Sequence, residues 1–295
     1  MRRTKNNKKS TIFALMLSLV VFFEILAPAV MAADDPLVMG VFPRRNATLT
    51  TRLFTPMAEH LSQQLGREVR LVTAKDFPSF WRGVSDRSYD IVHYNQYHYT
   101  ISADAYEVIA HNKEFGRSDV AGSLYVRSDS GITEVSQLAG RRIMFGGGED
   151  AMMSYILPRY LLLEAGLDNE DYEARFANSP PNAMMALYFN QAEASGAGDI
   201  LIDLPVVKRN INTAELTHLV KTEPLLHLPW AVKRGMNSQL RQEIQQSLVQ
   251  LEQTEKGRAV LKQAKMTGFG TAEDKDYDPH RRIIAKVMGS EKANH

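Results

Sequence analysis

This sequence predicts an α/β fold made of two units, each a parallel sheet with helices on both faces. Short apolar segments alternate with amphipathic helices between residues 37 and 110. The same alternation starts again after Gly131 and continues to residue 203. The chain has 295 residues and no cysteine, so the packing of these elements must stabilise both units without disulfides.

The first unit is expected to begin with a strand, a helix and a second strand. Apolar residues recur at four-residue spacing from Leu53 to Leu65, which places one apolar stripe on a helix that Gly66 ends. Asp76 is the expected cap of a shorter helix. The strands of this part are expected at 37–41, 69–73, 90–94, 107–110 and 123–126.

The second unit repeats this order, and a helical segment follows it. Its strands are expected at 142–145, 173–176 and 199–203, with helices at 153–164 and 181–191. Extended segments are expected at 218–221, 225–228 and 231–233. Ser238 is the expected cap of a helix that reaches residue 254, and further helices are expected at 255–265 and 278–288.

Residues 1–32 have the pattern of a secretory signal peptide. Five basic residues precede an apolar stretch at 11–21, and Val30, Met31 and Ala32 provide the small-residue pattern of a cleavage site. An uncleaved membrane anchor is the alternative, but the apolar stretch is short and Glu24 interrupts it. No cysteine follows that could carry a lipid. We therefore expect export to a bacterial periplasm and cleavage after Ala32 or Ala33.

Charge and composition exclude several classes of function. The first 33 residues hold five of the 35 basic residues and one of the 34 acidic residues, so the remainder has a net charge near −3. Such a balance gives no electrostatic footprint for nucleic acid. The absence of cysteine also excludes thiol catalysis and thiolate metal sites. About 263 residues would remain after cleavage, which suffices for one large domain or two medium domains.

The glycine-rich turn before residue 152 is the most informative local motif. A strand at 142–145 leads into three glycines, two acidic residues and a helix that contains Pro158. Such a turn exposes backbone N–H groups and the positive end of a helix dipole, which often bind ligands. A plain tight turn, with glycine chosen for positive φ, is the alternative.

Segments spread along the chain resemble one family. The segments are Gly40–Pro43, Ser88–Val92, Ser128–Ile132 with Leu138–Ile143, Tyr155–Leu161, and Thr267–Phe269 with Asp276–Pro279. In this order they resemble the phosphate, phosphite and phosphonate-binding proteins of ABC transporters, over residues 36–289. This resemblance implies a two-lobe periplasmic-binding-protein type II fold with a hinge and an interlobe cleft.

The resemblance also implies a function and a set of boundaries. It implies a solute-binding protein, not an enzyme, that takes a phosphonate-like or other small organic anion or zwitterion to an ABC permease. The alternative is a sensor that presents its ligand to a membrane receptor or histidine kinase. Lobe 1 is expected at 36–124 with the return 228–289, and lobe 2 at 127–222. Extended segments near 123–128 and 222–229 are expected to join them.

The expected ligand site lies where strands of both lobes end, because open α/β sheets bind ligands at the carboxyl ends of their strands. The candidates are Phe42, Arg44, Arg45, Tyr94, Asn95, Gln96, Tyr97, Glu149, Asp150, Met153, Ser154, Asn178 and Asp203.

Each group of candidates has an expected role and an ordinary alternative. Arg44 and Arg45 suit a carboxylate or phosphate, or face solvent. Glu149 and Asp150 either face the ligand, and then favour a molecule with an acidic end and an amine or apolar end, or cap the helix. Asp203 ends an expected strand, where it accepts hydrogen bonds from a ligand or caps the next helix.

Metal binding and catalysis find little support. Tyr, Asn and Gln are dense at 94–97, which suits hydrogen bonding to a small organic ligand. His93 and His98 raise the possibility of a transition metal, but no third ligand is evident, so we expect neither a metal nor another cofactor. No catalytic motif of a hydrolase, a nucleotide-binding loop or a metalloprotease is present.

Overall fold

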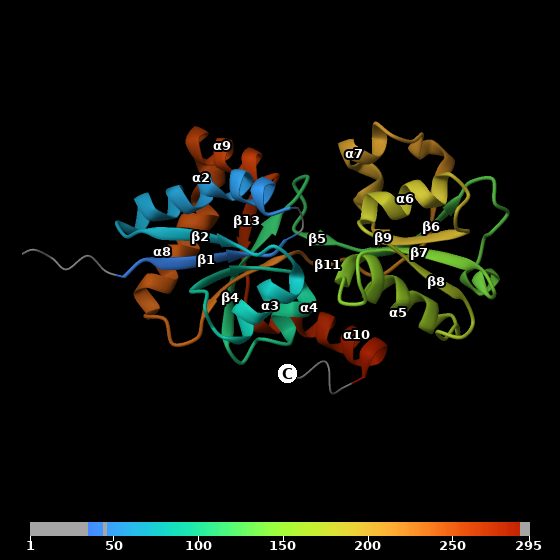
Figure 1. Ribbon diagram of the computed structural model, residues 1–295, viewed down its shortest axis with the longest axis horizontal. Coiled ribbons are helices and arrows are strands. Elements are labelled where there is room, and N and C mark those ends of the chain that lie inside the picture. The colour runs from blue at the N-terminus through green and yellow to red at the C-terminus, as the bar shows by residue number, and fades with distance from the viewer. Residues whose placement is uncertain (1–34, 44–45, 290–295) are drawn as a thin grey trace, which may run out of the picture. The chain divides into compact units, whose positions relative to one another are not determined.

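A computed structural model of the protein describes residues 35–43 and 46–289, and it contains two main sheets and one short strand pair (Figure 1). The first sheet has the order β13–β4–β12–β3–β1–β2. Its strands are β1 (Leu37–Val41), β2 (Val69–Thr73), β3 (Ile91–His93), β4 (Tyr106–Lys113), β12 (Pro229–Lys233) and β13 (Gly268–Thr271).

The second sheet has the order β10–β6–β9–β7–β8. Its strands are β6 (Gly122–Arg127), β7 (Arg142–Gly146), β8 (Glu173–Ala177), β9 (Ala194–Gly198) and β10 (Leu216–Lys221). The short pair consists of β5 (Asp119–Val120) and β11 (Leu225–Leu226), with Leu225 opposite Val120. This pair joins the two lobes, because β5 follows β4 of the first sheet and β11 precedes β12, the strand with which the chain enters that sheet again.

Helices cover both sheets and bury an apolar core in each lobe. The helices with the first sheet are α2 (Ala47–Leu65), α3 (Phe77–Ser85), α4 (Gln96–Thr100), α8 (Ser238–Val249) and α9 (Glu255–Ala264). Those with the second sheet are α5 (Leu157–Glu164), α6 (Pro180–Tyr188) and α7 (Pro205–Lys208). The last helix, α10 (Asp278–Met288), contacts both α4 and α5, so it links the lobes. No helix in the described ranges is both long and apolar enough to cross a membrane.

The sheets are mixed and not wholly parallel, which corrects the prediction. β1 is parallel to β2 and β3, and β7 is parallel to β8 and β9. The returning strand β12 is antiparallel to β3 and β4, and β6 is antiparallel to β9 and β10. Strands β12 and β6 follow the crossings between the lobes, whereas β13, which is antiparallel to β4, follows α9 of the same lobe.

The predicted strand at 199–203 is wrong, and the strand is β9 at Ala194–Gly198. A Cβ at Gly196 would lie 2.7 Å from the ring of Phe145 and 2.8 Å from Pro158. The strand therefore needs small residues to pack, and it lacks the apolar pattern that marks a strand in sequence. The apolar residues that follow form a 3-10 helix at Leu201–Asp203. The glycine-rich strand β13 was not predicted, because it too lacks that pattern.

Helix starts follow local capping chemistry. Asp76 caps α3 as predicted and accepts from the N–H of Ser79 at 2.8 Å. The cap of α8 is Asn237, one residue before the predicted Ser238. Strand β6 begins at Gly122, so the predicted end of lobe 1 at residue 124 falls inside a strand of the second sheet. The predicted signal peptide and the pair Arg44 and Arg45 lie outside the described residues.

Candidate functional site

The carboxyl ends of strands from the two lobes meet at α4. Asn95 follows β3 and caps α4, where its Oδ1 accepts from the N–H of His98 at 2.8 Å. Its Nδ2 donates to the carbonyl oxygen of Asp150 at 3.2 Å. Asp150 belongs to the glycine-rich turn after β7. One asparagine thus both starts a helix of lobe 1 and holds the turn of lobe 2.

The carboxylate of Asp150 faces His98 of the other lobe. His98 Nε2 lies 3.4 Å from Asp150 Oδ2, and His98 Nδ1 lies 2.7 Å from Asn95 Oδ1. The two ring nitrogens of His98 thus face one oxygen from each lobe. The hydrogen bond from His98 lowers the pKa of Asp150 below its ordinary value. His98 and Asp150 therefore form a polar contact between the lobes.

The structure distinguishes the environments of Glu149 and Asp150, the two acidic residues of the turn. The helix that follows the turn begins at Ala151 without a side-chain cap, so neither Glu149 nor Asp150 caps it. Asp150 is half-buried against His98, whereas Glu149 is exposed. Ligand contact by either acid stays a prediction.

A π-helical turn at Met152–Ile156 joins the glycine-rich turn to α5. Ser154 is buried there, and its hydroxyl donates to the carbonyl oxygen of Gly146. Gln96 of lobe 1 reaches this turn, because its Nε2 lies 3.6 Å from the sulfur of Met153 and 3.4 Å from the carbonyl oxygen of Leu226 in β11. These predicted site residues do come together, and in this structure they bind one another.

The two predicted tyrosines pack in different places. Tyr94 is completely buried in the lobe 1 core, where the hydroxyl of Ser102 lies 3.2 Å from its own, and burial raises its pKa. Tyr97 is partly buried against the core of lobe 2, and burial followed by the nearby charge of Asp150 raises its pKa. Tyr94 therefore does not reach the cleft surface, while Tyr97 is a contact between lobes.

Asn178 and Asp203 are exposed residues of lobe 2. Asn178 follows Ala177, whose carbonyl oxygen accepts from the N–H of Gly147 in the glycine-rich turn. Asp203 ends a 3-10 helix, not the predicted strand, and its carboxylate pairs with Lys208 at 2.8 Å. Its predicted position at a strand end is therefore wrong, because the strand stops at Gly198.

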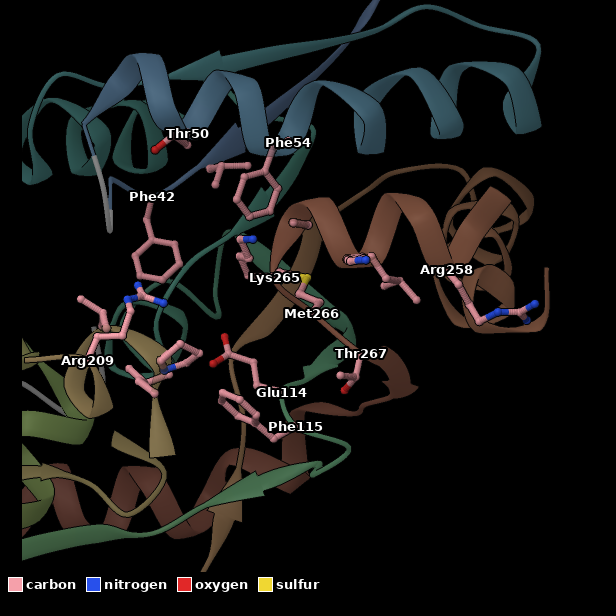
Figure 2. Close-up of a pocket in the computed structure, with 17 residues that line it drawn as sticks. Phe42, Thr50, Phe54, Glu114, Phe115, Arg209, Arg258, Lys265, Met266 and Thr267 are labelled. Atoms are coloured by element: carbon pink, nitrogen blue, oxygen red, sulfur yellow. The ribbon is translucent and has the colours of Figure 1, made fainter. Parts of the chain in front are cut away.

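A cavity of about 760 Å³ opens where lobe 1 meets α7 of lobe 2, and Figure 2 shows its lining. This volume is within the range of small-molecule sites. Phe42 is the predicted residue that lines it. The other lining residues are Val41, Thr50, Phe54, Glu114, Phe115, Leu204, Pro205, Val206, Arg209, Arg258, Leu261, Lys262, Ala264, Lys265, Met266 and Thr267.

Positive charge dominates this lining. Arg209, Lys262 and Lys265 are exposed, and in the described part of the chain none of them forms an ion pair. Arg209 extends from the end of α7 toward the ring of Phe42 (Figure 2). The carboxylate of Glu114 is the acidic group of the lining, and it lies 3.6 Å from His227 Nε2. Cations from both lobes thus face one space.

Sequence reasoning missed most of these lining residues. Glu114 follows β4, so the rule about strand ends would have found it, but the sequence placed the end of that strand at residue 110 instead of Lys113. Arg209 and Lys265 end helices and carry no comparable signal, since only the packing of α7 and α9 brings them to one cavity. Within the described residues no three His, Asp or Glu side chains form a group that could hold a metal ion.

The chain matches a family model and several solved structures. The model is described as the periplasmic substrate-binding protein of the phosphonate ABC transporter, and it matches residues 39–277. A binding protein component of an ABC phosphonate transporter from Pseudomonas aeruginosa is similar with a TM-score of 0.71 and 15% identity, over 88% of this chain and 89% of that one.

Two further structures cover similar shares. PhnD1 from Prochlorococcus marinus, in complex with methylphosphonate, gives a TM-score of 0.73 at 17% identity, over 86% of this chain and 98% of that one. A protein from Xanthomonas citri bound to ATP gives 0.71 at 18% identity, over 88% and 98%. These likenesses show a shared two-lobe α/β fold, as the sequence predicts.

Proposed function

Because the chain belongs to the family of periplasmic substrate-binding proteins of ABC phosphonate transporters, we propose that it captures a small organic phosphonate or related oxyanion between its lobes. The ligand would then pass to a permease in the inner membrane. This family consists of transport proteins and not of enzymes, and it is periplasmic. The comparisons give no support to the alternative of a sensor that addresses a membrane receptor or histidine kinase.

The cavity beside α7 is the observation that carries the proposal. It contains Arg209 from lobe 2 and Lys262 and Lys265 from lobe 1, and these cations have no ion-pair partner in the described residues. An anion between the lobes would pair with Arg209 of lobe 2 and with the lysines of lobe 1 at the same time. It would therefore favour an arrangement in which the two lobes are close together. Methylphosphonate, ATP and chloride, the ligands named for the similar structures, are all anions.

The sequence predicts a ligand with an acidic end and an amine or apolar end. The cavity also suits such a ligand, but with residues other than Glu149 and Asp150. Asp150 already pairs with His98, whereas Glu114 faces the cavity with the basic residues. A ligand with an acidic end would meet Arg209, and its second end would meet Glu114 or the apolar wall formed by Phe42 and Phe54. The predicted contacts of Arg44 and Arg45 remain part of this proposal.

Substitution of Arg209 tests the proposed anion site. Titration calorimetry of residues 33–295 should detect binding of methylphosphonate or 2-aminoethylphosphonate. Arg209→Gln should weaken that binding about tenfold to hundredfold, because a hydrogen-bonded charge pair is worth about 1.5–3 kcal/mol.

Arg70→Gln is the matched control, because Arg70 is exposed on β2 and does not line the cavity. It should leave the affinity unchanged. Equal losses in the two variants would contradict the assignment of Arg209, and an absence of binding by every phosphonate and by phosphate would contradict the proposed ligand class.

A further inference from the structure

Phe115 has a backbone conformation that an aromatic residue rarely adopts. Glu114 and Arg117 exchange two backbone hydrogen bonds of 3.1 and 3.0 Å, which close a tight turn with Phe115 and Gly116 at its tip. The φ angles of these two residues are 53° and 75°, in the left-handed region. Glycine or asparagine is usual at both positions of such a turn, so the phenylalanine strains it.

Both lobes hold this turn in place. The N–H of Gly116 donates to Thr267 Oγ1 at 2.9 Å. Arg117 forms an ion pair of 2.9 Å with Asp199 of lobe 2, and the other carboxylate oxygen of Asp199 accepts from the N–H of Ala121 at 3.1 Å. The turn is therefore fixed at the junction between the lobes.

The ring of Phe115 gains little from the protein itself. It is 51% exposed, and it lines the cavity that also contains Phe42 and Arg209 (Figure 2). Val206 on α7 of lobe 2 is 42% exposed and lines the same cavity. A half-exposed phenyl ring on a strained turn is not explained by core packing. Strain of this kind is characteristic of functional positions.

We propose that Phe115 is a specificity-determining residue that packs against the organic group of a bound phosphonate. The preferred ligand then has an apolar or aromatic substituent in place of the single methyl group of methylphosphonate. Arg209 supplies the charge for the phosphonate, and Phe115 with Val206 covers the substituent. This inference rests on the proposed function, since it names the ligand class of the same cavity.

Calorimetry with a series of ligands tests the role of Phe115. Phenylphosphonate, methylphosphonate, 2-aminoethylphosphonate and inorganic phosphate would be titrated into residues 33–295. The wild type should bind phenylphosphonate most tightly. Phe115→Gly should lower the ratio of phenylphosphonate to methylphosphonate affinity about tenfold, because a stacked ring pair and its buried area are lost.

Thermal unfolding of the same variant separates recognition from a structural role. Glycine adopts a φ of 53° without strain, so Phe115→Gly should not lower the melting temperature. Phe189→Ala is the matched control, since Phe189 is 58% exposed and lies outside the cavity, and it should not change the affinity ratio.

Four outcomes would overturn the inference. A wild type that binds phenylphosphonate no better than methylphosphonate, or a variant with an unchanged ratio, removes the role of Phe115 while the anion site stands. A preference for 2-aminoethylphosphonate assigns the second end of the ligand to Glu114 instead. If none of the four ligands binds, the proposed function and this inference both fail.

Discussion

The two lobes meet in two regions that differ in how their polar groups are used. In the first, the paired region, Asn95, Gln96, His98, Asp150 and Met153 bind one another across the lobes. In the second, the cavity of Figure 2, Arg209 and two lysines have no ion-pair partner in the described residues. We propose that the two regions have different roles: the paired region holds the lobes together, and the cavity receives the ligand.

A substitution at Gly146, at the end of the strand that leads to the turn with Asp150, should have the largest effect on stability. A Cβ at this position would clash with the backbone of Pro180 at the start of α6, and backbone cannot move aside as a flexible side chain can. Gly146→Ala should lower the free energy of unfolding by about 3 kcal/mol, as overpacked cores do. Urea denaturation would measure this loss.

Gly148→Ala is the control in the same turn. Its new Cβ would approach Asp150 Oδ1 at 3.0 Å, and its φ is not positive, so a small side-chain shift accommodates it. A loss as large as that of Gly146→Ala would show that the turn itself, and not its contact with α6, is sensitive.

The second prediction concerns His280, which shares a backbone contact with Gln96 of the paired region. Its Nε2 lies 3.1 Å from the carbonyl oxygen of Leu226, the same oxygen that Gln96 approaches. Complete burial lowers the pKa of His280 from 6.5 to about 3. Below pH 6.5 the unfolded chain binds a proton that the folded chain does not, so this residue's contribution to stability is lost as the pH falls.

The expected loss from His280 is about 2 kcal/mol between pH 7 and pH 5. Urea denaturation at these two values would show it, and His280→Gln, which keeps a hydrogen-bond donor but does not titrate, should reduce the difference. An identical pH dependence in wild type and variant would mean that His280 takes up its proton in the folded protein.

The smallest expected effect comes from two asparagine substitutions, which distinguish the capping of a helix from the contact between the lobes. Asn95→Ala and Asn46→Ala each remove a side chain that caps a helix, and each should cost about 1 kcal/mol in urea denaturation. Only Asn95 also bonds to the other lobe, through the carbonyl oxygen of Asp150. Asn95→Ala alone should therefore increase the radius of gyration in X-ray scattering, and equal radii in the two variants would oppose the proposed role of the paired region.

Local patterns determined much of the fold. Apolar spacing located α2, and Asp76 marked the start of α3, because both features depend on residues within a few positions of each other. The ordered motifs that end with Asp276–Pro279 indicated the family that the comparison confirmed. The position of strand β9 could not be predicted from local patterns, because its small residues are explained only by the ring of Phe145 packed against Gly196.

The site depended on the tertiary structure to a much greater degree. The sequence marked Asn95 and Asp150 as residues of two strand ends, but not that they bind each other, because 55 positions separate them. It gave no indication that Phe115 would adopt a positive φ or that Arg209 would share a cavity with it. Capping and periodicity are short-range and appear in the sequence, whereas charge pairing across the lobes exists only once both sheets have formed and packed.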